Sequence, residues 1–447
     1  MLRETVGSVR FEGKHICVDV DSDAFGSKNL VARFDASKLH PFTPSASDKG
    51  LFDLLDFCIA FYALDRSTPR PSDGWSRRFV MRLPVSDPDL WRRHMTLIRD
   101  WAYALTNDEM EVIPVPRRAD GEHHDRQPHL AVENACDTVG LVSDGLDSLC
   151  GVDAAIRERS RRIAWASVVG GSKGPQIDRV VAMSREIAGR RLPHFTINTS
   201  LSQRRHKARE KTQRSRTVLA IVMAFTTAHA IGANSVECYE NGIGLLNLPV
   251  PDLQFGAMST QVLQPKFLPL WDRISKAFFG HLIELRFPNR FETKSEMIRG
   301  LSERGLVLLP KTFSCDASER SKKSNVVHCG TCGSCRFRQL AIFDAGVDCD
   351  ANYAFVRRKN MKLDAAHLLH YHARLLGEAV ASDDPWAELC RLQPELRGIE
   401  LSDDLRLENR SANAARDHQQ SIKLRTIELI KRHTAAVARW TEPHRAA

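Results

Sequence analysis

The amino-acid sequence predicts an α/β protein built on a doubly wound parallel sheet. From Thr138 onward, short apolar runs alternate with segments of helical periodicity, an order that forms parallel sheets with helices on both faces. One apolar run ends in a loop of small residues, Ser143 to Ser148, which opens directly into a helix, as anion-binding loops do. Four cysteines between residues 315 and 335 are spaced for one metal ion. We therefore expect a parallel sheet that carries a small cysteine module.

The first 135 residues precede this pattern, and we interpret them as a separate N-terminal α/β extension of unknown role. Asp87-Pro88 is typical of a helix start, with proline in the first turn. Residues 117–128 are polar and rich in turn formers, which predicts a linker. The predicted elements are a strand at 8–20, a helix at 51–64, a strand at 79–85, a helix at 90–105 and a strand at 112–115.

Residues 136–350 contain the parallel sheet, and residues 351–447 are helical and charged. In open α/β sheets, ligands bind at the carboxyl ends of the strands. This rule places Ser143–Ser148, Ser167–Gly171 and Glu240–Gly244 around one pocket. The predicted strands lie at 139–142, 162–170, 194–198, 235–239 and 282–287, and the predicted helices at 149–156, 177–188, 217–231 and 294–304.

The loop from Ser143 to Ser148 carries groups that bind an anion. Gly145 can adopt a positive φ and allows a phosphate oxygen to approach the backbone closely. The hydroxyls of Ser143 and Ser148 lie at the two ends of the loop, and the following helix start adds N–H donors and a positive dipole end. The alternative is an ordinary turn between a strand and a helix, capped by serine or aspartate. The string S-x-G-L-D-S is more specific than the pattern of an ordinary capped turn, because it places hydroxyls at both ends of one short loop.

The cysteine module has the spacing of a tetrahedral metal site. Cys329, Cys332 and Cys335 form two overlapping C-x-x-C turns, whose glycines let backbone N–H groups fold toward the sulfurs. A ferredoxin-type iron–sulfur cluster needs another cysteine four residues after the third, and the sequence has none there. Cys315 is therefore the expected fourth ligand, with Cys349 in reserve. We predict a closed structural zinc site without a catalytic role.

The composition of the chain limits its protein class, its compartment and its partners. The chain has 447 residues, of which 43% are hydrophobic and 27% charged, as in soluble globular proteins of two or three domains. The N-terminal residues lack a secretion signal, no run of about 18 apolar residues occurs, and the eleven cysteines are expected to be reduced. We therefore expect a cytoplasmic protein with no membrane partner. The net charge of +9 and the basic residues between Arg204 and Arg216 permit nucleic-acid binding, but no stacking aromatics are interleaved there, so this partner is not favoured.

Two motifs in the same order resemble a known family. Ser143 to Ser148 resembles the SGGxDS loop of the PP-loop ATP pyrophosphatases, although Asp144 stands where that family has glycine. Thr312 to Cys315, followed by Cys329-Gly-Thr-Cys-Gly-Ser-Cys335, is similar to the C-terminal end of the 7-cyano-7-deazaguanine synthase (QueC) family. The resemblance covers about residues 138 to 350.

Three further segments bear on this resemblance. Lys294 to Ile298 lies where the QueC family has a Lys-x-Glu-Ile segment, and Arg214 and Arg216 lie where it has an Arg-Asn pair. The family's Tyr-Gly-Gln segment is replaced by Val168 to Ser172. A carboxylate at Asp144 repels phosphates unless it points away or binds Mg²⁺.

The resemblance implies an adenine nucleotide alpha hydrolase-like fold and an ATP-dependent, amide-forming ligase for a 7-deazaguanine carboxylic acid, with ATP, Mg²⁺ and structural Zn²⁺. The loop would hold pyrophosphate, Asp147 would fix its geometry through Mg²⁺ or by bracing the loop, and Arg216 and Lys294 would stabilise developing charge. The residues implied are Ser143, Asp147, Ser148, Arg216 and Lys294 for catalysis; Ser143, Asp144, Gly145, Leu146, Asp147, Ser148, Ser167 and Val168 for ATP and pyrophosphate; Glu240, Asn241 and Gly242 for the base; and Cys315, Cys329, Cys332 and Cys335 for zinc.

The outer regions extend beyond the compact synthase. This layout resembles the QueC-like proteins of bacterial anti-phage operons, notably the Qat system and type IV CBASS, which implies another defence-operon protein as a partner. The attacking amine would then be ammonia or the amino terminus of that partner. Two alternatives stay open: a nucleotide- or base-binding scaffold that Asp144 has disabled, and a nucleic-acid-modifying PP-loop enzyme, which the basic cluster near Arg204 would serve.

Overall fold

The computed structural model describes residues 4–12, 15–22, 28–35, 52–70, 76–117, 136–158, 162–170, 175–190, 192–203, 210, 214–248, 261–315, 327–349, 352–353, 365–399 and 412–441. The predicted linker beyond residue 117 and the basic residues 204–209 and 211 lie outside these segments. Residues 171–172, which replace the Tyr-Gly-Gln segment in part, lie outside them as well.

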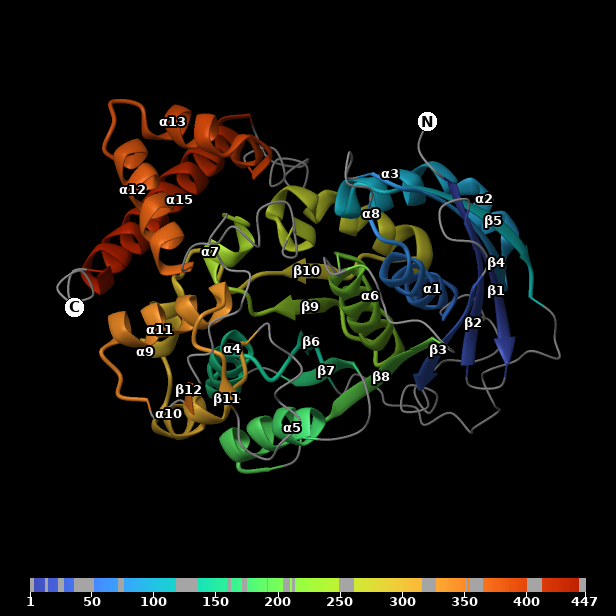
Figure 1. The fold of residues 1–447 in the computed structure, drawn as a ribbon, viewed down its shortest axis with the longest axis horizontal. Coiled ribbons are helices and arrows are strands. Elements are labelled where there is room, and N and C mark those ends of the chain that lie inside the picture. The colour runs from blue at the N-terminus through green and yellow to red at the C-terminus, as the bar shows by residue number, and fades with distance from the viewer. Residues whose placement is uncertain are drawn as a thin grey trace.

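A single ten-stranded sheet runs through the described part of the molecule (Figure 1). Its strands are β1 (Glu4–Glu12), β2 (His15–Ser22), β3 (Lys28–Asp35), β4 (Arg78–Val85), β5 (Glu109–Pro116), β6 (Thr138–Leu141), β7 (Ile163–Gly170), β8 (His194–Gln203), β9 (Ser235–Cys238) and β10 (Glu284–Arg286). They pair in the order β10-β9-β6-β7-β8-β3-β2-β1-β4-β5. A second, two-stranded sheet joins β11 (Val327–His328) to β12 (Asn352–Tyr353).

Helices cover this sheet and form the C-terminal region. They are α1 (Asp53–Ser67), α2 (Pro88–Arg93), α3 (Met95–Thr106), α4 (Leu146–Arg157), α5 (Pro175–Ala188), α6 (Arg214–Ala230), α7 (Gly242–Leu245), α8 (Leu268–Phe279), α9 (Lys294–Arg299), α10 (Glu303–Leu308), α11 (Gly333–Ala345), α12 (Ala365–Val380), α13 (Pro385–Leu392) and α15 (Ala412–Thr441). Short 3₁₀ turns are η5 (Gln261–Leu263), η6 (Pro265–Phe267), η7 (Leu309–Lys311) and η9 (Pro394–Leu396). None of the helices described is long and apolar enough to cross a membrane.

Five neighbouring strands, in the sheet order β8-β7-β6-β9-β10, form the predicted doubly wound parallel half. All pairings among these five strands are parallel. The chain starts at the central β6, moves outward through β7 to β8, and then returns through α6 to β9 and β10 on the other side. The order therefore reverses between β6 and β9, and ligands of open α/β sheets bind at such a switch point.

Side chains of β7 alternate between the two faces of this half. Ala164 and Ala166 belong to the apolar cluster that contains the buried side of α6, whereas Trp165 belongs to the cluster formed with α4. Gly140 in β6 has no room for a side chain, because a Cβ there would lie 2.4 Å from the Trp165 ring. On α4, a Cβ at Gly151 would lie 2.0 Å from Tyr239. These two glycines let α4 pack closely on the sheet and on the residue that follows β9.

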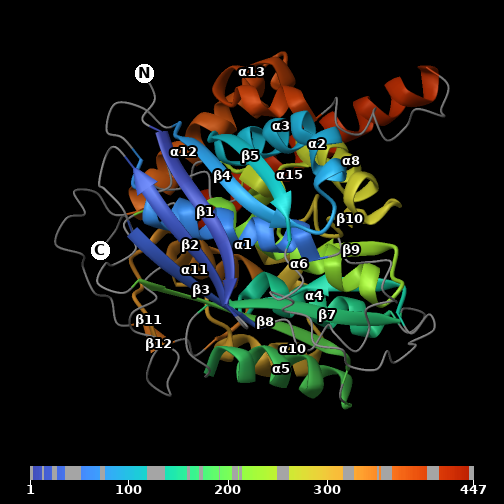
Figure 2. The same ribbon diagram turned by 90° about the vertical axis from the view of Figure 1, so that its right-hand side faces the viewer.

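The N-terminal residues continue the sheet and do not form a separate one. Strand β3 pairs antiparallel with β8, at Phe34 opposite Thr199, and β1, β2, β4 and β5 extend the same sheet (Figure 2). Alternation between residues 8 and 20 was expected to form one strand, but it is divided between β1 and β2, which pair antiparallel. Both halves of a hairpin have the same period of two, so alternation alone cannot separate them. Helix α1 packs against α6, and one apolar cluster spans both regions.

Two other predicted helices are divided. The helix expected at 90–105 breaks at His94 into α2 and α3, and the one expected at 294–304 breaks at Gly300 into α9 and α10. The helix start at Asp87-Pro88 is confirmed, because the Asp87 side chain accepts hydrogen bonds from the N–H groups of Asp89 and Leu90. Strand β3 was not expected.

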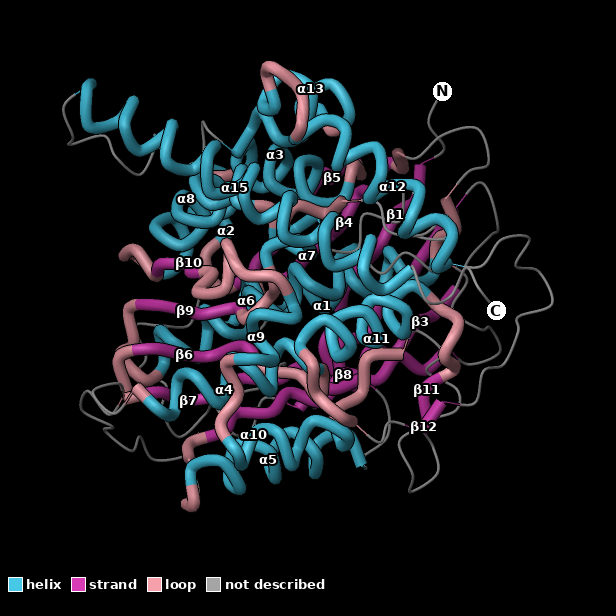
Figure 3. Tube along the Cα trace, turned by 90° about the vertical axis from the view of Figure 1, so that its left-hand side faces the viewer, coloured by secondary structure: helices cyan, strands magenta, loops and turns pink. Residues whose placement is uncertain are grey.

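The C-terminal helices are mounted on the parallel half through a third apolar cluster. Helices α12, α13 and α15 pack together in Figure 3, and Leu376, Leu389 and Leu429 from them share buried surface with Ile243 of α7. Since α7 directly follows β9, this packing brings the C-terminal region to the carboxyl end of the parallel strands.

Candidate functional site

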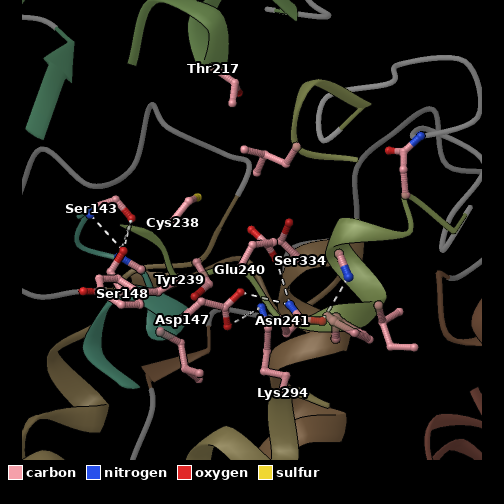
Figure 4. A pocket seen from close by; sticks show the side chains of 18 of the residues that line it. Ser143, Asp147, Ser148, Thr217, Cys238, Tyr239, Glu240, Asn241, Lys294 and Ser334 are labelled. Atoms are coloured by element: carbon pink, nitrogen blue, oxygen red, sulfur yellow. Dashed lines mark hydrogen bonds and ion pairs between the residues drawn. The ribbon is translucent and has the colours of Figure 1, made fainter. Parts of the chain in front are cut away.

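A cavity of about 730 Å³ lies at the switch point between β6 and β9. The loop after β6 and the segment after β9 line it together, as the strand order requires. Figure 4 shows Ser143 and Ser148 at one side, with Asp147, Glu240, Asn241 and Lys294 gathered beside them. Of the residues expected at a ligand site, the following line this cavity: Ser143, Gly145, Leu146, Asp147, Ser148, Val168, Arg216, Glu240, Asn241 and Lys294.

The loop after β6 is held by hydrogen bonds between its two ends. The Ser143 N–H donates to the Ser148 Oγ at 2.9 Å, and the two serine hydroxyls lie 3.0 Å apart. The Gly145 N–H donates to the Ser143 Oγ at 3.2 Å. Gly145 has a φ of −78°, so the positive φ that glycine allows is not used at this position. Its lack of a side chain matters instead, since a Cβ would lie 3.2 Å from the Ser143 Oγ.

The start of α4 faces this loop. Gly145 is the N-cap residue and provides no capping side chain, and the first intrahelical N–H bond runs from Leu149 to the Gly145 carbonyl. The N–H groups of the first turn, at Leu146, Asp147 and Ser148, therefore have no acceptor within the helix. Together with the helix dipole, they favour an anion in the cavity.

Asp144 does not line the cavity. Its side chain is buried, and its carbonyl accepts a hydrogen bond from the Phe313 N–H at 2.7 Å. Asp144 is therefore buried within the protein beside the loop and is not among the residues that line the cavity.

A partly paired charge cluster lies beside the loop. The Lys294 Nζ lies 3.2 Å from the Asp147 Oδ1, and both side chains are 14% exposed. The Asn241 Nδ2 donates to the Asp147 Oδ2 at 3.0 Å and to the Glu240 Oε1 at 2.8 Å. The Asn241 Oδ1 in turn accepts from the Gly244 N–H at 3.0 Å. Asn241 is thus engaged in bracing the cluster, which leaves it little capacity to recognise a base.

Burial and the nearby Asp147 carboxylate raise the pKa of Glu240 well above its usual range, and Lys294 only partly offsets this. For Lys294, burial lowers the pKa, but the carboxylates of Asp147 and Glu240 outweigh burial and raise it. The lysine is therefore held in its charged form. The raised pKa of Glu240 favours its protonated form, so the Asp147 carboxylate is the charge that Lys294 balances.

Arg216 lines the cavity from the first turn of α6, whereas its neighbour Arg214 is fully buried. The Arg214 guanidinium donates to the Thr106 carbonyl at 2.8 Å, and burial followed by the nearby Arg70 lowers its pKa to about 10. Of the two arginines singled out in the sequence, only Arg216 is placed to meet a ligand.

Besides Asp144, two further expected ligand residues do not line the cavity. The Ser167 hydroxyl is buried, where it donates to the Val142 carbonyl at 2.8 Å and pairs with the His194 Nε2 at 2.8 Å. Gly242 is buried against Arg290, whose carbonyl oxygen lies 2.3 Å from where a Gly242 Cβ would be. Both residues hold backbone in place near the site.

Sequence reasoning missed two walls of the cavity. One comes from the cysteine module, at Phe313, Ser334 and Phe337, and the other from the C-terminal region, at residues 392–395. These walls are brought to the loop by long-range packing, which no local pattern encodes. The position of Ser334 between two of the metal-spaced cysteines was the available signal for the first wall.

The four predicted metal ligands come together. The side chains of Cys315, Cys329, Cys332 and Cys335 are buried, and their sulfur atoms all lie within 4.8 Å of one another. N–H groups of the last three donate to sulfurs of the preceding cysteines at 3.3–3.4 Å, as in closed thiolate sites, and Gly330 has a φ of +75° in the turn between them. The donor set and burial fit a structural metal such as zinc. Cys349, the reserve ligand, is not part of the cluster.

Sequence comparisons find no match to this chain among models of protein families or among curated proteins.

Proposed function

We propose that the protein is a QueC-like PP-loop ligase that uses ATP to join a 7-deazaguanine carboxylic acid to an amine, with AMP and pyrophosphate as products. One observation carries this proposal: the Ser143–Ser148 loop and the start of α4 share a cavity with two cations, Arg216 and Lys294. Helix N–H groups, hydroxyls and cations in one cavity are what a polyphosphate requires.

In the first step, a carboxylate oxygen of the substrate attacks the α-phosphorus of ATP. The new C–O–P bond forms while the bond from the α-phosphorus to the bridging oxygen breaks, and pyrophosphate leaves with that oxygen. Ser143, Ser148 and the free N–H groups of the α4 start hold the departing pyrophosphate. Lys294 and Arg216 stabilise the negative charge that develops on it.

In the second step, the amine nitrogen attacks the activated carbonyl carbon. The C–N bond forms, the C–O bond to the phosphate breaks, and AMP leaves with that oxygen while the nitrogen loses a proton. Asp147 lies at the loop, and its carboxylate would hold a Mg²⁺ ion, which would neutralise phosphate charge when bound. Glu240, whose raised pKa favours its protonated form, would join it only on loss of its proton.

The outer regions support a protein as the amine donor in a defence system, because ammonia needs no docking surface. The C-terminal region reaches the cavity itself through residues 392–395. On this proposal, the amino terminus of a partner protein from the same operon receives the base. The scaffold alternative expects the same cavity to bind a nucleotide or base without turnover, and the following test separates the two.

The test is mass spectrometry of reactions that contain ATP, Mg²⁺ and 7-carboxy-7-deazaguanine, run with ammonia and separately with the proteins of the neighbouring genes. AMP formed together with a deazaguanine mass, on a small product or on a partner chain, is the expected result. Absence of AMP and of ATP–pyrophosphate exchange under every condition would contradict the ligase and favour a binding scaffold.

The structural zinc has its own test. Elemental analysis of the purified protein is expected to find one zinc per chain, and Cys332→Ala is expected to lose it. Cys349→Ala is the matched control and is expected to keep the metal, because Cys349 lies outside the cluster. Equal zinc contents in the two variants would contradict the assignment of the ligands.

A further inference from the structure

Three aromatic rings beside the four cysteines contact one another in succession, and the last of them lines the cavity. Tyr353 of β12 lies against His328 of β11, with ring centroids 5.5 Å apart. His328 in turn stacks on Phe313, with 5.4 Å between ring centroids and 28° between ring planes. His328 is fully buried, whereas Phe313 is only partly buried and belongs to the cavity wall. The succession of rings therefore starts inside the protein and ends at the cavity.

Hydrogen bonds fix the position of Phe313. Its N–H donates to the Asp144 carbonyl at 2.7 Å, which ties Phe313 to the loop after β6. The His328 Nε2 accepts from the Ser314 N–H at 3.2 Å, which holds the imidazole against the Phe313 ring. Phe313 is thus a preformed part of the wall, one backbone hydrogen bond away from the Ser143–Ser148 loop.

A second phenylalanine of the wall, Phe337 of α11, is already engaged by other side chains. The Lys294 Nζ lies 5.1 Å from its ring centroid, and the His433 ring meets it edge-on, with centroids 5.6 Å apart. Among the residues that the structure describes, the Phe313 ring has one aromatic partner, His328, and no cation over it. Aromatic side chains in a binding site stack on heterocyclic bases, since every base has a π-face. Phe313 is therefore the better placed of the two phenylalanines to meet a base.

The bond between Phe313 and the loop indicates which base this ring meets. On the proposed function the loop holds pyrophosphate, so the α-phosphorus of ATP lies next to the loop. The carboxylate that attacks this phosphorus is bonded directly to the substrate base, whereas adenine is separated from it by the ribose. A ring that is tied to the loop therefore lies closer to the substrate base than to adenine. Of the residues first expected to bind the base, Asn241 is engaged in the charge cluster and Gly242 does not line the cavity.

We infer that Phe313 is a specificity-determining residue, whose ring stacks on the heterocyclic base of the substrate. The inference rests on the proposed function and deepens it, because it selects acids that are built on a flat aromatic ring. It also relates the cysteine module to substrate binding, since Phe313 packs against the four cysteines.

Phe343 offers a matched control. It lies on α11 of the same module, is 46% exposed and does not line the cavity. Phe313→Leu and Phe343→Leu therefore remove the same kind of ring, and only the first change lies in the cavity wall. Phe313→Tyr is the conservative variant, because it keeps an aromatic ring at this position.

The experiment is titration calorimetry of the wild type and the three variants with 7-carboxy-7-deazaguanine, and separately with ATP. Phe313→Leu is expected to weaken binding of the acid by about 5- to 150-fold, the range that follows the loss of one stacked base. Phe313→Tyr and Phe343→Leu are expected to bind the acid like the wild type. ATP affinity is expected to be unchanged in all three variants.

Several results would overturn the inference. Equal affinities of Phe313→Leu and Phe343→Leu for the acid would show that the base does not meet this ring. A loss confined to ATP would assign the ring to adenine. Wild-type protein that does not bind the acid at all would overturn the proposed function as well.

If Phe313→Leu does not fold, nuclear magnetic resonance decides the matter. Wild-type protein made with ring-labelled phenylalanine is expected to show a nuclear Overhauser contact between the bound acid and a phenylalanine ring. Phe313→Tyr should bind the acid and lose this contact, which assigns it to Phe313. Contacts that all persist in Phe313→Tyr, or bound acid without any such contact in the wild type, would overturn the inference.

Discussion

Two buried charge clusters in this molecule are built from the same kinds of side chain and differ in how completely they are paired. In the N-terminal ion network, Arg70 and Arg77 pair with Asp65 and Asp108, and all four side chains are at most 6% exposed. In the cavity cluster, one lysine serves Asp147 and Glu240.

Each aspartate of the N-terminal ion network has a guanidinium partner. Arg77 contacts Asp65 at 2.6 Å and Asp108 at 2.7 Å, and Arg70 bonds both Asp108 oxygens at 2.9 Å. Burial alone would raise the pKa of Asp65, but Arg77 and the bonds from Arg77 and Ser215 outweigh it and lower that pKa. For Glu240 burial prevails and its pKa rises. The difference is that each aspartate of the N-terminal ion network has a guanidinium partner, whereas Asp147 and Glu240 have one lysine between them.

The largest expected effect on stability comes from Arg77→Met. Removal of this guanidinium leaves two buried carboxylates short of a partner, which costs about 3–5 kcal/mol of the free energy of unfolding. Chemical denaturation measures the loss. The control is Arg10→Met, because Arg10 and Asp19 form an exposed pair at 2.9 Å whose removal costs about 1 kcal/mol or less. Similar losses in the two variants would contradict the stabilising role of the N-terminal ion network.

Lys294→Met is expected to act on turnover more than on stability. On the proposed function, loss of this cation lowers the rate by about 10²- to 10³-fold, which ATP–pyrophosphate exchange would measure. Lys311→Met is the matched control, because Lys311 lies on the surface, 3.6 Å from Glu186. An exchange rate equal to that of the control would contradict a role of Lys294 in turnover.

Glu240→Gln is expected to change the pH dependence of stability. A raised pKa means that the folded state binds more protons than the unfolded one, so the free energy of unfolding falls as pH rises above about 4.5, by up to about 1.4 kcal/mol per pH unit. The variant should lose this slope in denaturation series between about pH 5 and 8.

The lowered pKa of Asp65 has the opposite sign. Its contribution is complete above about pH 4 and is lost as pH falls through the folded-state pKa. The control for the Glu240 series is Glu284→Gln, on the exposed face of β10, which should keep the wild-type slope. Parallel curves for wild type and Glu240→Gln would contradict the assignment of the slope to Glu240.

The smallest expected effect belongs to Ser215→Ala. The Ser215 hydroxyl donates to the Asp65 Oδ2 at 2.5 Å, and its N–H donates to the same oxygen at 3.2 Å, so Asp65 caps α6 from another part of the chain. Loss of the hydroxyl costs about 1 kcal/mol, measured as a shift of the denaturation midpoint. Ser184→Ala, which removes only a bond to the Val181 carbonyl within α5, should shift it less. The reverse order would contradict the capping role.

The sequence predicted what short-range patterns encode. Helical periodicity located α4, α5 and α6, the carboxyl-end rule placed the loop after β6 beside Glu240, and the spacing of cysteines selected Cys315. What it missed depends on contacts between distant segments. The pairing of β3 with β8, the cavity walls at Ser334 and residues 392–395, and the engagement of Asn241 by Asp147 have no local signature.

The pairing of β3 with β8 has a consequence for how this chain can be divided. Without the first 135 residues, β8 would become an edge strand of ten residues with one side of its backbone unpaired. Long exposed edges of this kind recruit other strands and drive aggregation. A shortened chain that begins at residue 136 is therefore expected to self-associate, even though it keeps the loop and the cysteines. In the whole chain, β3 covers this edge of β8. We therefore expect insertions or fusions to be tolerated better after residue 441 than at the pairing of β3 with β8.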